Sequence, residues 1–129
     1  MSSETLHESA DTIGKEAVDA HRAIVSVMEE LEAVDWYNQR AKATTNPELR
    51  AILEHNRDEE KEHAAMVLEW LRRTDPKLAQ HFKTFLFTDG PITEIEANME
   101  EGADEDANAA PPASGDGSLA IGSLKQVSK

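Results

Sequence analysis

Two ionisable residues, Glu60 and His63, lie in the middle of a stripe of apolar residues at helical spacing. At about 100° of turn per residue, this stripe falls on one face of a helix predicted to begin after Asn46 and to end near Thr74. Its members are Leu49, Ile52, Leu53, Asn56, Glu60, His63, Val67, Trp70 and Leu71. An unpaired carboxylate in such a place costs several kcal/mol. A metal ion is the natural compensating charge, because the glutamate oxygen and the histidine nitrogen lie one helical turn apart.

A longer helix is predicted before this one, from near residue 9 to about residue 43. Its apolar residues recur at three and four positions, which is typical of a helix with one buried side. They are Ile13, Ala17, Ala20, Ile24, Val27, Leu31, Val34 and Ala41. The segment 44–47 separates the two helices, since Asn46 is a good N-cap and Pro47 suits the first helical position.

The pattern therefore predicts an all-α fold, an antiparallel two-helix hairpin plus a short third helix that begins at Pro76 and ends near residue 90. No segment has the alternation of a strand. A hairpin alone cannot cover both of its faces, and 129 residues with only 5% aromatic content give a thin core. We expect the chain to form a homo-oligomer.

Composition narrows the function further. The formal net charge of -13 argues against nucleic acid as a partner and favours cations. The absence of cysteine means that a metal would be held by oxygen and nitrogen, a ligand set suited to iron, manganese or zinc. No apolar run has transmembrane length and the N-terminus does not resemble a signal peptide, so no membrane partner and a cytoplasmic location are expected.

Three domains are expected along the chain. Residues 1–90 form the helical domain, residues 91–117 an acidic disordered linker, and residues 118–129 a C-terminal docking peptide. The peptide is apolar again after the acidic stretch, and such a motif on a tether is typical of a segment that binds another protein. The apolar residues are Leu119, Ile121 and Leu124. The alternative is a frayed tail with incidental leucines.

The first helix carries Glu30, with Tyr37 two turns later on a common line beside the apolar stripe. Di-metal four-helix bundles use one glutamate from each of two helices and a Glu-x-x-His motif from each of the other two. This chain holds half of that pattern. A two-fold dimer would supply the other half by forming a four-helix bundle.

Two more acidic residues, Glu29 and Glu32, flank Glu30 on the outer side of the helix. They could collect incoming cations, although acidic residues on a helix usually form only a solvated face. Trp36 lies near Glu29 and could wall such a site or serve as an interface aromatic.

Together these motifs closely resemble the encapsulated ferritin family. The resemblance covers residues 28–37 (MEELEAVDWY), residues 55–64 (HNRDEEKEHA), residues 88–93 (TDGPIT) and the Gly-Ser-Leu tail. It implies a ferritin-like four-helix bundle built from two half-bundle domains, with a ferroxidase centre of two iron ions per dimer. The centre would consist of Glu30, Glu60 and His63 from two subunits, with Tyr37 beside it.

The resemblance also implies that Glu29 and Glu32, with Trp36 nearby, form a secondary metal site on the route by which iron arrives. Members of the family assemble as a ring of dimers, typically a decamer. They are carried as cargo inside an encapsulin nanocompartment in the cytoplasm, where the iron is stored and detoxified. The segment 118–129 would then be the peptide that docks onto the encapsulin shell protein.

Other functions remain open at this point. One is a non-catalytic, metal-gated assembly or adaptor protein in which zinc, manganese or calcium takes the place of iron and only locks the dimer. Another is a di-iron peroxidase similar to rubrerythrin, although the usual electron-delivery centre needs cysteine, which this chain lacks. The last is a plain helical interaction module, which the charged residues inside the apolar stripe disfavour.

Overall fold

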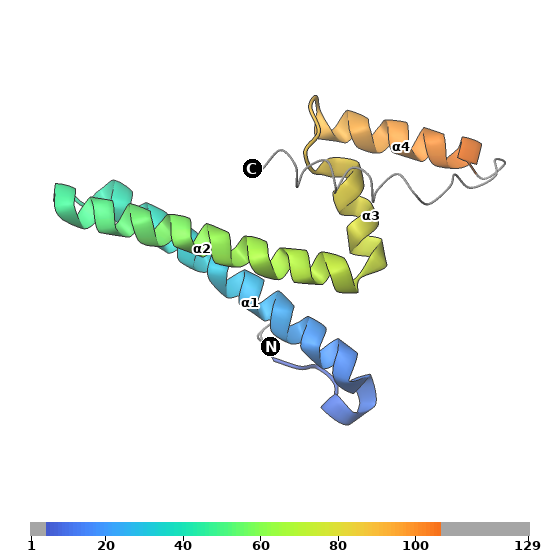
Figure 1. Cartoon of the computed structure of the whole chain (residues 1–129), viewed down its shortest axis with the longest axis horizontal. Helices are drawn as coiled ribbons and strands as arrows, with labels where there is room; N and C mark the ends of the chain where they lie inside the picture. The colour runs from blue at the N-terminus through green and yellow to red at the C-terminus, as the bar shows by residue number, and fades with distance from the viewer. Residues whose placement is uncertain (1–4, 107–129) are drawn as a thin grey trace, which may run out of the picture. The chain divides into compact units, whose positions relative to one another are not determined.

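The computed structural model describes residues 5–106, which form four helices and no strand (Figure 1). Helix α1 spans Ala10–Ala43, α2 spans Pro47–Thr74, α3 spans Pro76–Phe85 and α4 spans Ile92–Asp106. The all-α prediction is confirmed for this part of the chain. No helix within it is long and apolar enough to cross a membrane. Residues 107–117 of the expected linker and the expected docking peptide 118–129 lie outside the described residues.

These residues belong to two compact units that divide between Lys83 and Thr84. The first unit contains the hairpin of α1 and α2, which pack against each other (Figure 1). Both helices of the hairpin have the bounds that the sequence predicts.

Helix α1 is interrupted one turn after its start. Ser9 caps that first turn by accepting a hydrogen bond from the backbone N–H of Thr12 at 3.2 Å. Gly14 then adopts a φ of 87° and a ψ of 168°, which breaks the helical path before the main part of α1 begins. A side chain at this position would meet no neighbour within 4 Å, so glycine is needed for the backbone conformation and not for space.

The turn of the hairpin is held from both sides. Asn46 caps α2, since its side-chain oxygen accepts from the backbone N–H of Leu49 at 3.0 Å. The guanidinium of Arg50 reaches back to the end of α1, where it donates to the carbonyl oxygens of Ala41 at 3.0 Å and Thr44 at 2.6 Å. These bonds satisfy carbonyls that the end of a helix leaves without partners.

We call the line along which α1 and α2 meet the hairpin seam. Its buried or half-buried members recur at three and four residues on both helices, as two packed helices require. On α1 they are Val27, Glu30, Val34, Asn38 and Ala41, and on α2 they are Leu53, Arg57, Glu60, Ala64, Val67 and Leu71.

The seam covers only part of the apolar surface. Three members of the stripe predicted for α2, Leu49, Ile52 and Trp70, are between 42% and 51% exposed, whereas Ala64, outside that stripe, is buried. The predicted stripe therefore combines two faces of α2, one against α1 and one left uncovered. Large exposed side chains on α1 include Ile24 and Leu31. This agrees with the expectation that a single hairpin cannot cover both of its faces.

In the second unit, helix α4 corrects the expectation of a disordered linker from residue 91. Residues 92–106 are helical, with Pro91 accepting at the start from the backbone N–H groups of Glu94 and Ile95. Ile92, Ile95 and Met99 recur at three and four residues, and acidic residues suit the first turn of a helix. The lack of basic residues and the few apolar residues in this stretch favoured disorder, whereas the spacing of its apolar residues indicates a helix.

We predict that Asn46→Ala lowers the free energy of unfolding by about 1 kcal/mol, because the first turn of α2 loses its cap. Urea unfolding of the metal-free protein, followed by circular dichroism, measures this loss. Ser9→Ala is the matched control and should cost less, since Ser9 caps only the single turn before Gly14. Equal losses would contradict the view that this turn adds little to the stability of the hairpin.

Candidate metal centre

The hairpin brings Glu30 of α1 against Glu60 and His63 of α2. One ligand atom from each of the three lies within 4.8 Å of the other two. Among the residues that the structure describes, these three side chains form the one group of acidic and histidine residues close enough together to hold a metal ion. We call it the Glu30–Glu60–His63 cluster.

The imidazole of His63 turns its Nδ1 atom toward both carboxylates. Nδ1 lies 3.3 Å from Oε2 of Glu60 and 3.7 Å from Oε2 of Glu30. The side chains are 23% exposed at Glu60, 27% at Glu30 and 42% at His63. The cluster is therefore half-buried and still accessible to an ion from solvent.

The two carboxyl groups interact directly with each other. The pKa of Glu30 is raised from its ordinary value, first by its hydrogen bond to Glu60 and then by burial. The pKa of Glu60 is lowered, chiefly because it accepts that hydrogen bond and also because it interacts with His63. A hydrogen bond between two carboxyl groups needs a proton on one of them, and the two shifts favour that proton on Glu30, as in other crowded carboxyl pairs.

The charge of the cluster also acts on the histidine. The pKa of His63 is raised, chiefly by its hydrogen bond to Glu60. Burial lowers this pKa, but the negative charges of Glu60, Glu30 and Glu59 raise it further. A protonated imidazole is therefore favoured at this place when no other cation is present. A metal ion would replace both this proton and the one that the carboxyl groups share.

The donor set fits a divalent metal ion. Two carboxylate oxygens and one imidazole nitrogen suit iron, manganese or zinc, and Nδ1 faces the same space as the two carboxylates. Three ligands from one chain leave coordination positions open. Those positions are free for water, a substrate or ligands from a second chain.

The other residues predicted for the site lie nearby on α1 without joining the cluster. Tyr37 is half-buried and Trp36 is 49% exposed, and the guanidinium of Arg40 lies 5.7 Å and 6.0 Å from the centres of their rings. Glu29 and Glu32 are both exposed. The charge of Glu29 is the smallest of the causes that raise the pKa of Glu30, after Glu60 and burial.

Glu59 was not among the residues predicted for the site. One of its oxygens lies 4.0 Å from Nε2 of His63, the ring atom on the far side from the carboxylates, and the other lies 3.4 Å from Nε2 of His55. Histidine ligands generally donate their second N–H to such a carboxylate, which orients the ring. The spacing of four residues between Glu59 and His63 was a signal for this contact. The side chain of His55 is 70% exposed.

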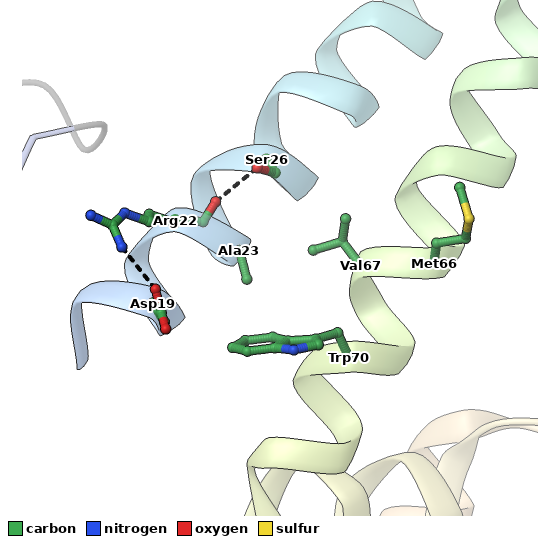
Figure 2. A pocket seen from close by; sticks show the side chains of 7 residues that line it. All are labelled: Asp19, Arg22, Ala23, Ser26, Met66, Val67 and Trp70. Carbon is green, nitrogen blue, oxygen red and sulfur yellow. Dashed lines mark hydrogen bonds and ion pairs between the residues drawn. The ribbon is translucent and has the colours of Figure 1, made fainter. Parts of the chain in front are cut away.

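An open groove lies between the same two helices next to the cluster. Figure 2 shows the Trp70 ring and the Val67 side chain extending toward α1, while Arg22 forms an ion pair with Asp19 at 2.9 Å. The charged side chains of the groove thus pair with each other, and the rest of its lining is mostly apolar. The groove has no converging set of ionisable groups and is not a second candidate for chemistry. Its lining consists of Asp19, Arg22, Ala23, Ser26, Met66, Val67 and Trp70.

Comparisons with known proteins place this geometry in context. Residues 5–89 match the model of the EncFtn-like family. The encapsulated ferritin-like protein of Rhodospirillum rubrum is 64% identical over 127 residues, which cover 97% of this chain and 91% of that protein. The encapsulin nanocompartment cargo protein EncC of Myxococcus xanthus is 40% identical over 85 residues, or 61% of this chain and 65% of that protein. A crystal structure of a protein from Nitrosomonas europaea aligns with a TM-score of 0.65 and 57% identity, covering 67% of this chain and 96% of that one.

We predict that the metal-free protein loses thermal stability as the pH rises from about 6 to about 8, the range in which histidine titrates. A histidine whose pKa is raised on folding stabilises the folded state fully below its unfolded pKa, and that contribution is lost as the pH passes the folded pKa. Thermal unfolding in the presence of a chelator measures the slope.

His63→Gln should flatten this slope, because glutamine cannot take up the proton. His81→Gln, a change at an exposed histidine of α3, is the control and should leave the slope unchanged. A wild-type midpoint that rises over the same pH range would contradict the proposed charge balance of the cluster.

Proposed function

The chain belongs to the EncFtn-like family, and on that basis we propose that it is a ferroxidase which oxidises ferrous iron at the Glu30–Glu60–His63 cluster. The observation that carries the proposal is the convergence of two carboxylates and one imidazole nitrogen within 4.8 Å. Iron is the substrate of this reaction, and the cluster supplies the ligands that hold it.

A second copy of the chain would complete the centre. One copy offers two carboxylates and one histidine, so two copies offer four carboxylates and two histidines, which is the ligand set of a ferritin-like di-iron bundle. Four carboxylates carry four negative charges, and two ferrous ions carry four positive charges. A two-fold interface repeats every ligand and would therefore give a neutral centre.

Assembly and metal binding should be coupled for the same reason. The uncovered apolar side chains, such as Leu31 and Trp70, favour association with further copies. The carboxylates oppose it until a cation neutralises them. Metal-dependent dimers, and from them a ring-shaped decamer, are accordingly part of the proposal.

The reaction needs an electron acceptor, for which we propose dioxygen. Two ferrous ions each lose one electron, and dioxygen takes up both electrons together with two protons to give hydrogen peroxide. The protein contributes positioning and charge: Glu30 and Glu60 stabilise the higher charge of ferric iron better than that of ferrous iron. His63 contributes a neutral ligand, so the charge balance of the ferrous state is preserved.

The neighbouring residues have supporting roles in this proposal. Glu29 and Glu32 are exposed and flank the cluster in sequence, which suits a secondary metal site that collects ferrous iron, with Trp36 beside it. Tyr37 is half-buried two turns after Glu30 and would lie beside the iron centre. Both assignments rest on position and on the family.

We further propose that the chain is cargo of an encapsulin shell. Two relatives support this by name, one as an encapsulated ferritin-like protein and one as an encapsulin cargo protein. Residues 118–129 would dock onto the shell protein through Leu119, Ile121 and Leu124, and the oxidised iron would be stored inside the compartment.

We predict that Glu30→Ala, Glu60→Ala and His63→Ala each reduce the rate of ferrous oxidation by about two orders of magnitude or more, the usual scale for loss of an essential charged group. Each change removes one ligand per chain and leaves the helices intact. Absorbance of ferric iron and an oxygen electrode measure the rate, and circular dichroism checks the fold. Wild-type rates in all three variants would refute the assigned centre.

Glu32→Ala is the matched comparison. It should slow the uptake of iron at low concentration more than the rate at saturation, because Glu32 is outside the cluster. The same oxygen measurements separate a catalytic centre from a metal-gated assembly or adaptor protein. Such a protein would bind ferrous iron without consuming oxygen, both as the wild type and in every variant.

A second prediction concerns residues 118–129. Their removal should abolish loading into co-expressed encapsulin shells, because the apolar residues of the peptide would be lost, and should leave ferrous oxidation by the free protein unchanged. Fusion of residues 117–129 to an unrelated soluble protein should make that protein cargo. Normal loading of the shortened chain, measured on purified shells, would return this segment to the alternative of an incidental tail.

A further inference from the structure

The hairpin seam contains a polar pair that the metal chemistry does not use. Arg57 of α2 is only 17% exposed at its side chain, and its Nη1 donates a hydrogen bond to Oδ1 of Asn38 on α1 at 3.0 Å. This bond joins two side chains of different helices across the seam. The seam residues around it are mainly alanine, valine and leucine, so a polar pair in this place calls for an explanation.

The guanidinium of Arg57 is fixed on its own helix. Nε donates to Asp58 at 3.0 Å, Nη2 lies 3.5 Å from the second oxygen of Asp58, and Glu54 lies 4.0 Å away. These carboxylates balance the charge and hold the planar group, so that Nη1 faces α1. A planar guanidinium held in this way demands an acceptor in one position.

The rest of the seam defines the alignment of α1 and α2 only weakly. Small apolar side chains such as Ala41 and Ala64 pack almost equally well after a small slide or rotation of one helix. Arg50 ties the turn, but it donates to backbone carbonyls, which every neighbouring residue offers equally. Buried polar pairs, by contrast, are known to fix the register of packed helices, because other registers leave them without partners.

The position of α1 along α2 matters for the cluster, because a small slide of one helix would separate the three ligand atoms. Glu30 lies about 20 Å along α1 from the turn, given the rise of about 1.5 Å per residue, so the turn controls its position only loosely. A slide of one helical turn is about 5.4 Å. That is more than the 4.8 Å within which the three ligand atoms now lie.

We propose that the Arg57–Asn38 hydrogen bond is a register lock that aligns Glu30 with Glu60 and His63. Both are positioning residues, and neither touches the metal. The inference rests on the proposed function in that the cluster must bind a metal ion. Arg57 acts through position, since its guanidinium pairs with Asp58, Glu54 and Asn38.

The test replaces both polar side chains with leucine, in the double variant Asn38→Leu/Arg57→Leu. An apolar pair should preserve or raise the thermal midpoint of the metal-free protein, since replacing a polar pair within a helix interface by apolar side chains is often neutral or stabilising. Binding of cobalt(II), used as a spectroscopic probe that does not turn over, should weaken by about tenfold or more, the range for partners of metal ligands. The visible bands of bound cobalt should also change in shape, because the ligands are no longer held in one arrangement.

Two further variants separate register from general stability. Asn38→Asp keeps the acceptor oxygen and should bind cobalt(II) nearly as the wild type does. Arg50→Gln removes the bonds at the turn and should lower the thermal midpoint without changing the cobalt bands.

The outcomes are distinguishable. Wild-type cobalt affinity and bands in the double variant would overturn the register lock. A parallel loss of thermal stability and cobalt affinity would overturn it too, since Arg57 and Asn38 would then be ordinary stabilising residues. Failure of the wild-type protein to bind cobalt(II) would instead count against the proposed metal centre itself.

Discussion

The structure depends on the meeting of two carboxylates and one imidazole across a helical hairpin. Glu30, Glu60 and His63 occupy positions that apolar side chains would otherwise fill, and their proximity raises the pKa values of Glu30 and His63. Such a cluster is costly in a small domain with few buried residues. A bound cation would offset this cost, which is the physical basis of the proposed metal centre.

The same constraint accounts for the shape of the chain. A two-helix hairpin leaves one face of each helix uncovered, as Leu31, Ile52 and Trp70 show. A complete four-helix bundle in one chain would bury these residues and close the centre permanently. In the proposed function, a hairpin that pairs with a second copy would instead link three events, namely iron binding, neutralisation of the carboxylates and burial of the apolar faces.

Much of the fold could be predicted from the sequence because its signals are local. Helical periodicity, Asn46 as a cap and Pro47 at the first helical position set the bounds of the hairpin helices. The residues of the cluster were also predictable, since charged residues inside an apolar stripe are conspicuous and the motifs resemble a known family.

Other features depend on which face of α1 packs against which face of α2. Helical periodicity in the sequence does not determine this. The stripe predicted for α2 merged two faces, so Ala64 was missed as a buried residue and Leu49 and Ile52 were expected to be buried. The contact of Arg57 with Asn38 joins residues 19 apart and becomes visible only when α1 and α2 are aligned. Helix α4 was missed because composition was given more weight than the spacing of Ile92, Ile95 and Met99.

The central claim is that two copies of the chain share one iron-oxidising centre. An anaerobic titration with ferrous iron, followed by native mass spectrometry and then by admission of air, tests it most directly. The account predicts saturation at two iron ions per pair of chains, formation of the pair as iron binds, and consumption of oxygen as the ferric absorbance rises. Saturation by single chains without association, or bound iron that stays ferrous in air, would contradict it.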